Sequence, residues 1–172
     1  MQQSTNQQSI LEVHPSAKAE QYALLSQQLG SVFENERDFI ANMANCAALI
    51  YNTLPDLNWA GFYLLRGNDL VLGPFQGKPA CVRIPLGKGV CGTAAQRQST
   101  IVVEDVNQFP GHIACDIASQ SEIVIPVVKD ENLIGVLDID SPIVKRFNAE
   151  DAAGLETLVA VFIQLTDIPT IQ

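Results

Sequence analysis

Apolar residues recur at helical spacing in three stretches of the chain, two near its beginning and one near its end. In the first, which starts at Ala17, they are Tyr22, Leu25, Leu29, Val32 and Phe33. In the second, from about Arg37 to Asn52, they are Phe39, Met43, Cys46, Ala47 and Ile50. In the third they are Leu155, Leu158, Val159 and Phe162, after Asn148 and an Asp151 three residues on that is typical of a capped helix start. These spacings predict three helices, and Gly30 leaves the end of the first one open.

Between these helices the pattern changes to short apolar runs separated by turn residues, which predicts β-strands. The runs lie at 59–66, 69–75, 80–84, 99–106, 122–129 and 133–141. A glycine-rich turn with a short helix at 86–98 interrupts them, and an irregular loop covers about 104–121. The tight turn Asp130-Glu131-Asn132 joins the last two runs, so we expect them to form an antiparallel hairpin.

Helices at both ends of a run of mostly antiparallel strands predict an α+β fold. We expect a central sheet with helices on one face and the long loop, which carries Cys115, over the other. The polar stretch 1–15 has little periodicity and predicts a mobile N-terminal tail. The remainder, 16–168, is expected to form a single domain, and no internal repeat is visible in it.

The composition is that of an ordinary globular protein, with 47% hydrophobic and 17% charged residues among 172. A formal net charge of −9 repels phosphate backbones and anionic membranes, so neither nucleic acid nor a membrane is an expected partner. No apolar run approaches the roughly 20 residues of a membrane span. The polar start lacks the basic and apolar regions of a signal peptide, which favours the cytoplasm.

Strand alternation brings several carboxylates to one end of the predicted hairpin. Asp138 and Asp140 share a face of the last strand, and Glu122 opens the strand before it. Because the hairpin reverses direction, the start of one strand lies beside the end of the next, so the three carboxylates should meet. They repel one another unless a cation, a proton or an amine sits among them, which predicts a binding site. A solvated strand end is the simpler alternative.

An earlier strand carries two aromatic residues on one face. Trp59, Gly61 and Tyr63 alternate along 59–66 and therefore point the same way. Because glycine has no side chain, we expect a slot between two aromatic walls. Aromatic pairs on strands are more often part of the core, so this pattern alone does not define a site.

Three of the four cysteines lie outside the predicted helix stripes. Cys46 lies on the apolar stripe of the second helix and is expected to be a core residue. Cys91 lies near a predicted helix N-terminus, where unpaired N–H groups favour a thiolate, and Cys115 lies in an accessible loop of small residues. Cys81 starts a predicted strand, a position that on its own indicates a structural role. Together, however, the three cysteines favour a redox relay over a role in packing. A structural disulfide framework is not expected in a cytosolic chain, nor a zinc site without Cys-x-x-Cys or ligand-spaced histidines.

These residues occur in stretches that resemble the free methionine-(R)-sulfoxide reductases, small enzymes built on the GAF fold. The resemblance runs from about Arg37 to Leu165. It rests on NWAGFYLL (58–65), LVLGPFQGKPACVRIPLGKGVCGTA (70–94), GHIACD (111–116), SEIVIP (121–126) and IGVLDIDS (134–141). Generic GAF domains share the glycine-rich turn and the late strand pattern, but not this cysteine trio together with the three carboxylates.

The resemblance implies a role for each of these residues. It implies that Cys115 is the catalytic cysteine and that Cys81 and Cys91 are the two other reactive cysteines. The substrate-pocket residues that it implies are Trp59, Tyr63, Glu122, Asp138 and Asp140. It also implies a homodimer that takes electrons from thioredoxin, and we expect no metal and no cofactor.

The implied chemistry is a thiol-dependent reduction. The Cys115 thiolate attacks the sulfur of free methionine-(R)-sulfoxide while a buried carboxyl with a raised pKa donates a proton to the oxygen, and Trp59 and Tyr63 hold the thioether end. The resulting sulfenic acid condenses with a second thiol, for which Cys81 and Cys91 both stay open. Two alternatives remain: a GAF module that binds a ligand or senses redox state without turnover and, more distantly, a cysteine hydrolase with His112 as its base.

Overall fold

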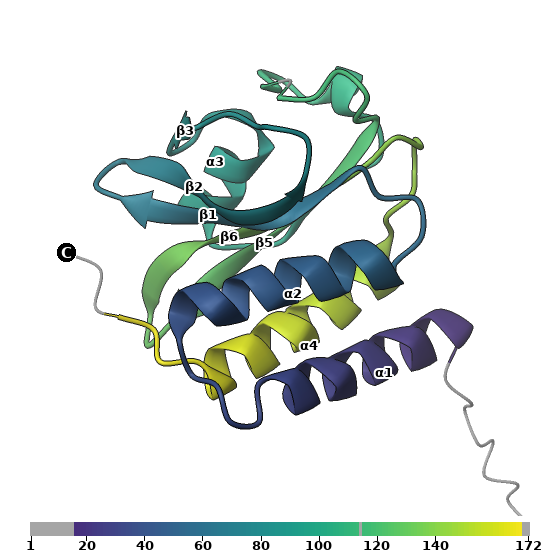
Figure 1. The fold of residues 1–172 in the computed structure, drawn as a ribbon. Coiled ribbons are helices and arrows are strands. Elements are labelled where there is room, and N and C mark those ends of the chain that lie inside the picture. Colours follow the sequence, from purple (N-terminus) through teal and green to yellow (C-terminus); the bar gives the residue numbers. More distant parts are fainter. Residues whose placement is uncertain (1–15, 114, 170–172) are drawn as a thin grey trace, which may run out of the picture.

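Six antiparallel strands form one curled sheet at the centre of the structure, a computed structural model that describes residues 16–113 and 115–169 (Figure 1). In chain order the strands are β1 (Trp59–Arg66), β2 (Asp69–Gly77), β3 (Arg83–Pro85), β4 (Ile101–Val103), β5 (Ser121–Lys129) and β6 (Asn132–Ser141). Their order across the sheet is β3-β2-β1-β6-β5-β4, and every neighbouring pair is antiparallel. The predicted hairpin of the last two strands is confirmed.

Three helices lie on one side of this sheet (Figure 1). They are α1 (Ala17–Val32), α2 (Phe39–Thr53) and α4 (Ala149–Leu165). Helices α2 and α4 pack on the sheet, and α1 packs on α4 and α2 from the outer side. Helix α3 (Gly89–Arg97) lies on the opposite face, and so does the loop before β5, which contains the short 3-10 helix η1 (Val106–Gln108). The predicted α+β architecture is confirmed, with the addition that one short helix shares the face of the loop.

The helix ends follow local capping. The side chains of Ser16 and Asp38 accept hydrogen bonds from the N–H groups of Ala19 and Ala41, which starts α1 and α2. The predicted cap at Asn148 is confirmed as a reciprocal capping box with Asp151. Because Asp38 supplies the cap, the second helix begins at Phe39 and not at Arg37.

Two predicted strands are shorter in the structure than the sequence pattern suggested. The run 80–84 becomes β3 at Arg83–Pro85, so Cys81 lies in the connection before the strand, and 99–106 becomes β4 at Ile101–Val103. Both are edge strands that pair with a single neighbour. Pairing on one side only limits their length: β3 begins only at Arg83, late in its predicted run, and β4 ends at Val103, before its predicted run does.

Each face of the sheet has a core of its own. The larger core lies between the sheet and the three covering helices and includes Cys46, as predicted. The smaller core, on the other face, packs α3 against residues of β1 and β6 that include Trp59, Tyr63 and Val136. The candidate site therefore rests on a packed apolar layer and not on open sheet.

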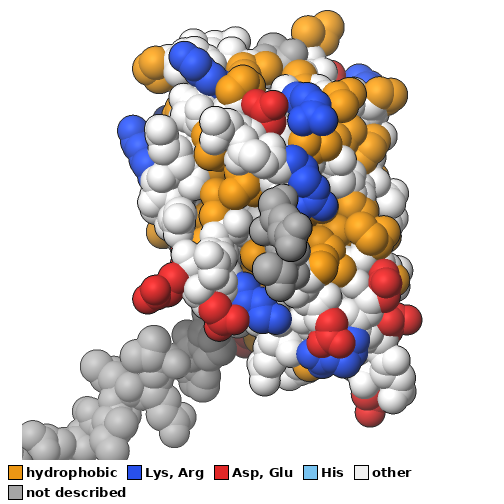
Figure 2. All heavy atoms as spheres, turned by 90° about the vertical axis from the view of Figure 1, so that its left-hand side faces the viewer, with side chains coloured by type: hydrophobic (Ala, Val, Ile, Leu, Met, Phe, Trp, Pro, Cys, Tyr) orange, Lys and Arg blue, Asp and Glu red, His pale blue; other side chains and the backbone are white. Residues whose placement is uncertain are grey.

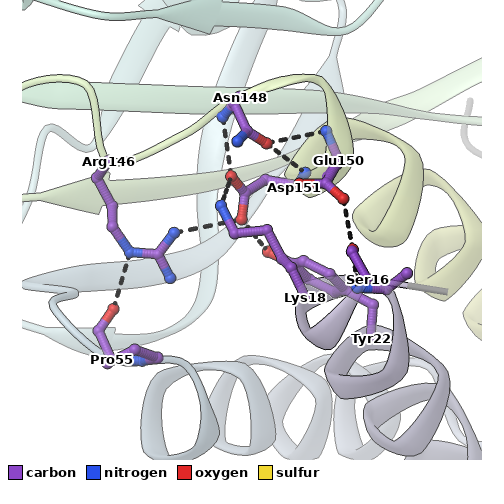
Figure 3. Close-up of polar contacts among 9 residues, drawn as sticks. Ser16, Lys18, Tyr22, Pro55, Arg146, Asn148, Glu150 and Asp151 are labelled. Carbon is purple, nitrogen blue, oxygen red and sulfur yellow. Dashed lines mark hydrogen bonds and ion pairs between the residues drawn. The ribbon is translucent and has the colours of Figure 1, made fainter. Parts of the chain in front are cut away.

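A buried carboxylate fastens α1 to α4. The side chain of Asp151 accepts hydrogen bonds from Lys18 Nζ at 2.6 Å, Tyr22 Oη at 2.8 Å and Arg146 Nη1 at 3.2 Å (Figure 3). Its other contact is the backbone N–H of Asn148, at 2.8 Å. The N-terminal helix is thus held to the C-terminal one by charge as well as by apolar packing.

Acidic side chains are unevenly distributed over the surface. In Figure 2 most of the carboxylates in view lie in the lower half, which is the helical layer of Figure 1. Lysine, arginine and hydrophobic side chains are interspersed over the upper part of this view, where the sheet lies. The negative charge behind the net value of −9 is therefore not spread evenly over this side of the molecule.

Within the described part of the chain, no helix is both long enough and apolar enough to cross a bilayer. The stretch 1–15, predicted to be a tail, lies outside the described residues, and the division of the chain at residue 16 stays a prediction.

Candidate functional site

The hairpin of β5 and β6 brings the three predicted carboxylates together. In the antiparallel register Glu122 pairs with Asp140, and Val124 pairs with Asp138. On the other side of β6, Asp138 lies beside Gly61 of β1 and Asp140 lies beside Trp59. All three acids therefore occupy the face of the sheet that α3 and the long loop cover, as the alternation predicted.

These acids line a cavity of about 30 Å³. Its walls are Ile84, Gly89, Val90, Cys91, His112, Ile113, Cys115, Asp116, Ser119, Glu122, Asp138 and Asp140. Glu122 and Asp138 are each 6% exposed, and Asp140 is half-buried. The cavity joins the sheet, the first turn of α3 and the loop of Cys115, so segments far apart in sequence form one site.

The cavity is a poor environment for negative charge. Burial raises the pKa values of Glu122, Asp138 and Asp140 well above the usual range, and a neighbouring carboxylate adds to the effect in each case. His112 Nε2 lies 3.5 Å from Glu122 Oε2, but burial lowers the pKa of this histidine, which favours its neutral form. One carboxylate oxygen, Asp138 Oδ1, is buried and has no hydrogen-bond partner among the described residues. Among the described residues, no lysine or arginine pairs with Glu122, Asp138 or Asp140.

Cys91 lies in the first turn of α3, and its Sγ is 3.8 Å from Glu122 Oε1. It is buried, and burial together with Asp138 and Glu122 raises its pKa well above the usual value. The expectation that the helix N-terminus favours a thiolate here is therefore wrong for this state. The burial of Cys91 and the negative charge of two neighbouring acids outweigh the partial positive charge at the N-terminus of the helix.

Cys81 and Cys115 form a disulfide, with their Cα atoms 5.4 Å apart. Of the two cysteines that the sequence left open as partners of Cys115, the structure therefore pairs Cys81. Cys91 is a free thiol in the same cavity wall, and Cys46 is a free thiol in the helical core.

The aromatic slot predicted on β1 is filled. The rings of Trp59 and Tyr63 stack at a centroid distance of 5.8 Å, and Trp59 also stacks on Phe75 at 5.3 Å. A Cβ at Gly61 would come within 2.3 Å of Phe75 Cβ, so the glycine permits close packing and leaves no gap. Both predicted aromatics are buried and form the layer beneath the acids. Neither lines the cavity.

Sequence reasoning missed the residues that hold the Cys115 loop in place. Asn58 Nδ2 donates to Ser119 Oγ at 3.0 Å and to Asp116 Oδ2 at 3.3 Å, and the N–H of Ala118 donates to Asp116 Oδ1 at 2.9 Å. The bond from the Ala118 N–H lowers the pKa of Asp116 most, and the bond from Asn58 and a contact with Lys78 lower it further, although burial opposes them. The sequence contained only a weak signal, an aspartate directly after Cys115 in a predicted loop, where such residues often form Asx turns.

Comparison with known proteins gives consistent matches over most of the chain. The GAF domain family matches residues 27–165. The free methionine-R-sulfoxide reductase of Escherichia coli (strain K12) is 57% identical over 143 residues, 83% of this chain and 87% of that protein. The structure of fRMsr of Staphylococcus aureus in complex with substrate is 51% identical with a TM-score of 0.82, and the match covers 90% of this chain and 98% of that one. Free methionine-R-sulfoxide reductase from Neisseria meningitidis in complex with its substrate is 44% identical with a TM-score of 0.84, covering 88% and 92%.

Proposed function

The chain belongs to the free methionine-R-sulfoxide reductases, which are built on the GAF domain, and we propose that it reduces free L-methionine-(R)-sulfoxide to L-methionine with Cys115 as the attacking thiol. One observation carries this proposal. Cys115 lines the same cavity as the carboxyl groups of Glu122, Asp138 and Asp140 and is bonded to a second cysteine, Cys81. A nucleophile, an acid and a resolving thiol are therefore available around one small volume.

The substrate ammonium supplies the positive charge that the cavity lacks. Asp138 Oδ1 has a free lone pair, and Glu122 and Asp140 lie beside it on the same face. A charged amine among them satisfies the oxygen and offsets the repulsion between the acids. In a peptide the same nitrogen is a neutral amide, so this contact selects the free amino acid.

The other end of the amino acid fits the start of α3. Gly89, Val90 and Cys91 are the first three residues of that helix and line the cavity. Their N–H groups have no intrahelical acceptor, and helix N-termini favour anions. The substrate carboxylate directed there would leave the sulfoxide free to face Cys115.

The buried acids also provide the proton for the reaction. Glu122 and Asp138 are buried close together, and the pKa of each is raised by burial and by a neighbouring acid, so the pair holds a proton more tightly than exposed carboxyl groups do. Attack of the Cys115 sulfur on the sulfoxide sulfur, with this proton passed to oxygen, transfers the oxygen to cysteine. Methionine sulfur is reduced by two electrons, and Cys115 is oxidised to a sulfenic acid.

Cys81 then resolves the intermediate. Its thiol attacks the sulfenic sulfur, the Cys81–Cys115 bond forms and the oxygen leaves as water. The Cα separation of 5.4 Å supports this pairing, because a disulfide needs Cα atoms within about 7 Å of each other. The role of Cys91 in turnover, which the family resemblance implies, stays a prediction, as do the homodimer and the cytoplasmic location.

An exposed apolar collar favours a protein dithiol, thioredoxin, as the reductant. Val82, Ile113 and Ile117 lie within two residues of the disulfide cysteines and are 65%, 37% and 92% exposed. Large exposed aliphatic side chains are a feature of surfaces that bind proteins. A partner that presents a thiol to the disulfide would cover this collar and bury it.

Turnover on several substrates tests the proposed activity. With NADPH, thioredoxin reductase and thioredoxin, we expect consumption of NADPH with free methionine-(R)-sulfoxide, and none with the S epimer or a peptide-embedded sulfoxide. Cys115→Ser removes the nucleophile and should abolish turnover, whereas the matched core variant Cys46→Ala should retain it. Wild-type rates from Cys115→Ser, or saturable binding without turnover, would replace the reductase with a ligand-binding module.

Substitution in the collar tests the reductant. Ile117→Ser removes the most exposed aliphatic side chain without touching the cavity, so we expect the KM for thioredoxin to rise several-fold. The KM for the sulfoxide and the rate with excess dithiothreitol should not change. A control at an exposed aliphatic residue of α1, on the helical side of the sheet, Leu24→Ser, should leave all three values unchanged. Equal thioredoxin kinetics in the two variants would remove the collar from the docking surface.

A further inference from the structure

We propose that the same cavity binds a divalent transition metal ion, with Zn²⁺ as the best match, through Cys91, Glu122 and Asp138. One sulfur and two carboxylate oxygens from these residues lie within 4.8 Å of one another, and all three residues are buried. The Cys91 Sγ to Glu122 Oε1 distance is 3.8 Å. In a tetrahedral zinc site with Zn–S about 2.3 Å and Zn–O about 2.1 Å, ligand atoms are separated by about 3.5 Å. Moving the three ligand atoms about 1 Å closer together therefore gives the spacing of a tetrahedral zinc site.

A second observation supports a ligand in this cluster. Asp138 is 6% exposed, lines the cavity and keeps Oδ1 without a hydrogen-bond partner in the described chain. A buried carboxylate oxygen in this condition carries a desolvation cost that a bound cation removes. The cavity of about 30 Å³ has room for an ion and a coordinated water.

The donor set selects the metal. A cysteine sulfur is a soft ligand that favours zinc and its neighbours over magnesium or calcium, which prefer oxygen. His112 Nε2 lies 3.5 Å from Glu122 Oε2, so it is in reach as a fourth ligand in place of water. Binding requires Cys91 and the two carboxyl groups to release their protons, and the two positive charges of the metal replace them.

The redox cysteines are not needed for this site. Cys81 and Cys115 are joined to each other, and Cys91 remains a free thiol beside the acids. The metal can therefore bind while the disulfide is intact. Because the ion and the substrate ammonium would use the same carboxylates, metal and substrate should exclude one another; this consequence rests on the proposed function.

Cobalt provides a test that does not depend on turnover. We expect Co²⁺, added to the full-length protein in its disulfide form, to give a thiolate-to-cobalt charge-transfer absorption that saturates at one equivalent and is displaced by Zn²⁺. In this form Cys91 and Cys46 are the only free thiols, so Cys91→Ser should abolish the band and the control Cys46→Ala should keep it. Asp138→Asn should weaken cobalt binding at least tenfold. Circular dichroism of each variant confirms that it is folded.

The outcomes separate the metal site from the reductase. No charge-transfer band in the wild type, or a band that persists in Cys91→Ser, overturns the metal site even if the protein reduces methionine sulfoxide. Cobalt bound through Cys91 without any turnover supports the metal site and overturns the proposed function. Displacement of cobalt by free methionine-(R)-sulfoxide supports the shared carboxylates, and coexistence of the two ligands refutes them.

Discussion

The molecule buries carboxylates in two places, and their surroundings differ. The side chain of Asp151, between α1 and α4, is 0% exposed and contacts Lys18 at 2.6 Å and Arg146 at 3.2 Å (Figure 3). Burial alone raises the pKa of Asp151, but the hydrogen bonds from Lys18 and Tyr22 lead a set of contacts that lower it below its usual value. This acid has its counter-charges within the chain.

The acids of the cavity have no such arrangement. Glu122, Asp138 and Asp140 have raised pKa values, since burial and mutual repulsion act in the same direction. The ionisable groups beside them are His112 and Cys91, which burial favours in their neutral forms, the buried Tyr63 and a fourth carboxyl, Asp116. A carboxylate paired within the fold stabilises the fold, whereas unpaired buried carboxyls cost stability and are ready to bind an external cation.

The largest expected effect is on catalysis. Asp138→Asn keeps the shape of the side chain but removes an ammonium contact and a proton site, so kcat/KM for free methionine-(R)-sulfoxide should fall about 100-fold or more. The matched variant Asp151→Asn, at the other buried carboxylate, should leave kcat/KM unchanged at a temperature where it is folded. Steady-state kinetics of the two purified variants decide the matter. Equal losses in both would show that the two regions do not differ as argued.

The next effect is on stability and has the opposite distribution. Asp151→Asn leaves Lys18 and Arg146 beside a neutral amide in a partly buried place, so we expect it to lower the free energy of unfolding by about 2–4 kcal/mol. Asp138→Asn should leave that free energy unchanged or raise it, because it removes an unpaired buried acid. Urea unfolding at pH 7 measures both values. A cavity variant less stable than the Asp151 variant contradicts the comparison.

The sequence predicted the meeting of the acids because strand alternation has a period of two and a short turn reverses the chain. In the structure Asp130 and Glu131, both with positive φ, form the turn that pairs Lys129 with Asn132. An irregularity between Val127 and Val128 then shifts the register by one residue, and this shift brings Glu122 opposite Asp140. The counter-charges of Asp151 were not predictable in this way. Lys18 lies 133 residues away in sequence, and only the packing of α1 on α4 brings it near.

The pairing of the cysteines and the packing of the aromatics were also beyond the pattern. Cys81 and Cys115 are separated by 34 residues and lie in connections without periodicity. On β1, Phe75 Cβ of the neighbouring strand and the ring of Trp59 take up the space beside Gly61, and single-strand alternation contains no information about the neighbouring strand. Features set by one strand or one turn were predictable, while those set by contacts between irregular segments were not.

The smallest expected effect is a difference in pH dependence, and its sign distinguishes the two regions. The folded pKa of Asp138 is raised, so between the unfolded value, near pH 4, and the folded one the native state holds a proton that the unfolded chain has lost. Wild-type stability therefore falls as the pH rises through this window. Asparagine does not titrate. Between pH 4 and pH 7 the free energy of unfolding of Asp138→Asn should therefore rise by about 1 kcal/mol relative to that of the wild type. Glu122 and Asp140 still titrate in the variant, so part of the pH dependence remains.

Asp151 should behave in the reverse way. Its folded pKa is lowered, so its contribution is complete above the unfolded value and is lost as the pH falls through the folded one. The deficit of Asp151→Asn should consequently be full at pH 7 and shrink below about pH 4. Urea midpoints of the wild type and both variants, measured from pH 3 to pH 7 with the disulfide intact, give the two slopes. If the stability difference between variant and wild type changes with pH in the same direction for Asp138→Asn and Asp151→Asn, the cavity acids are paired in the native state.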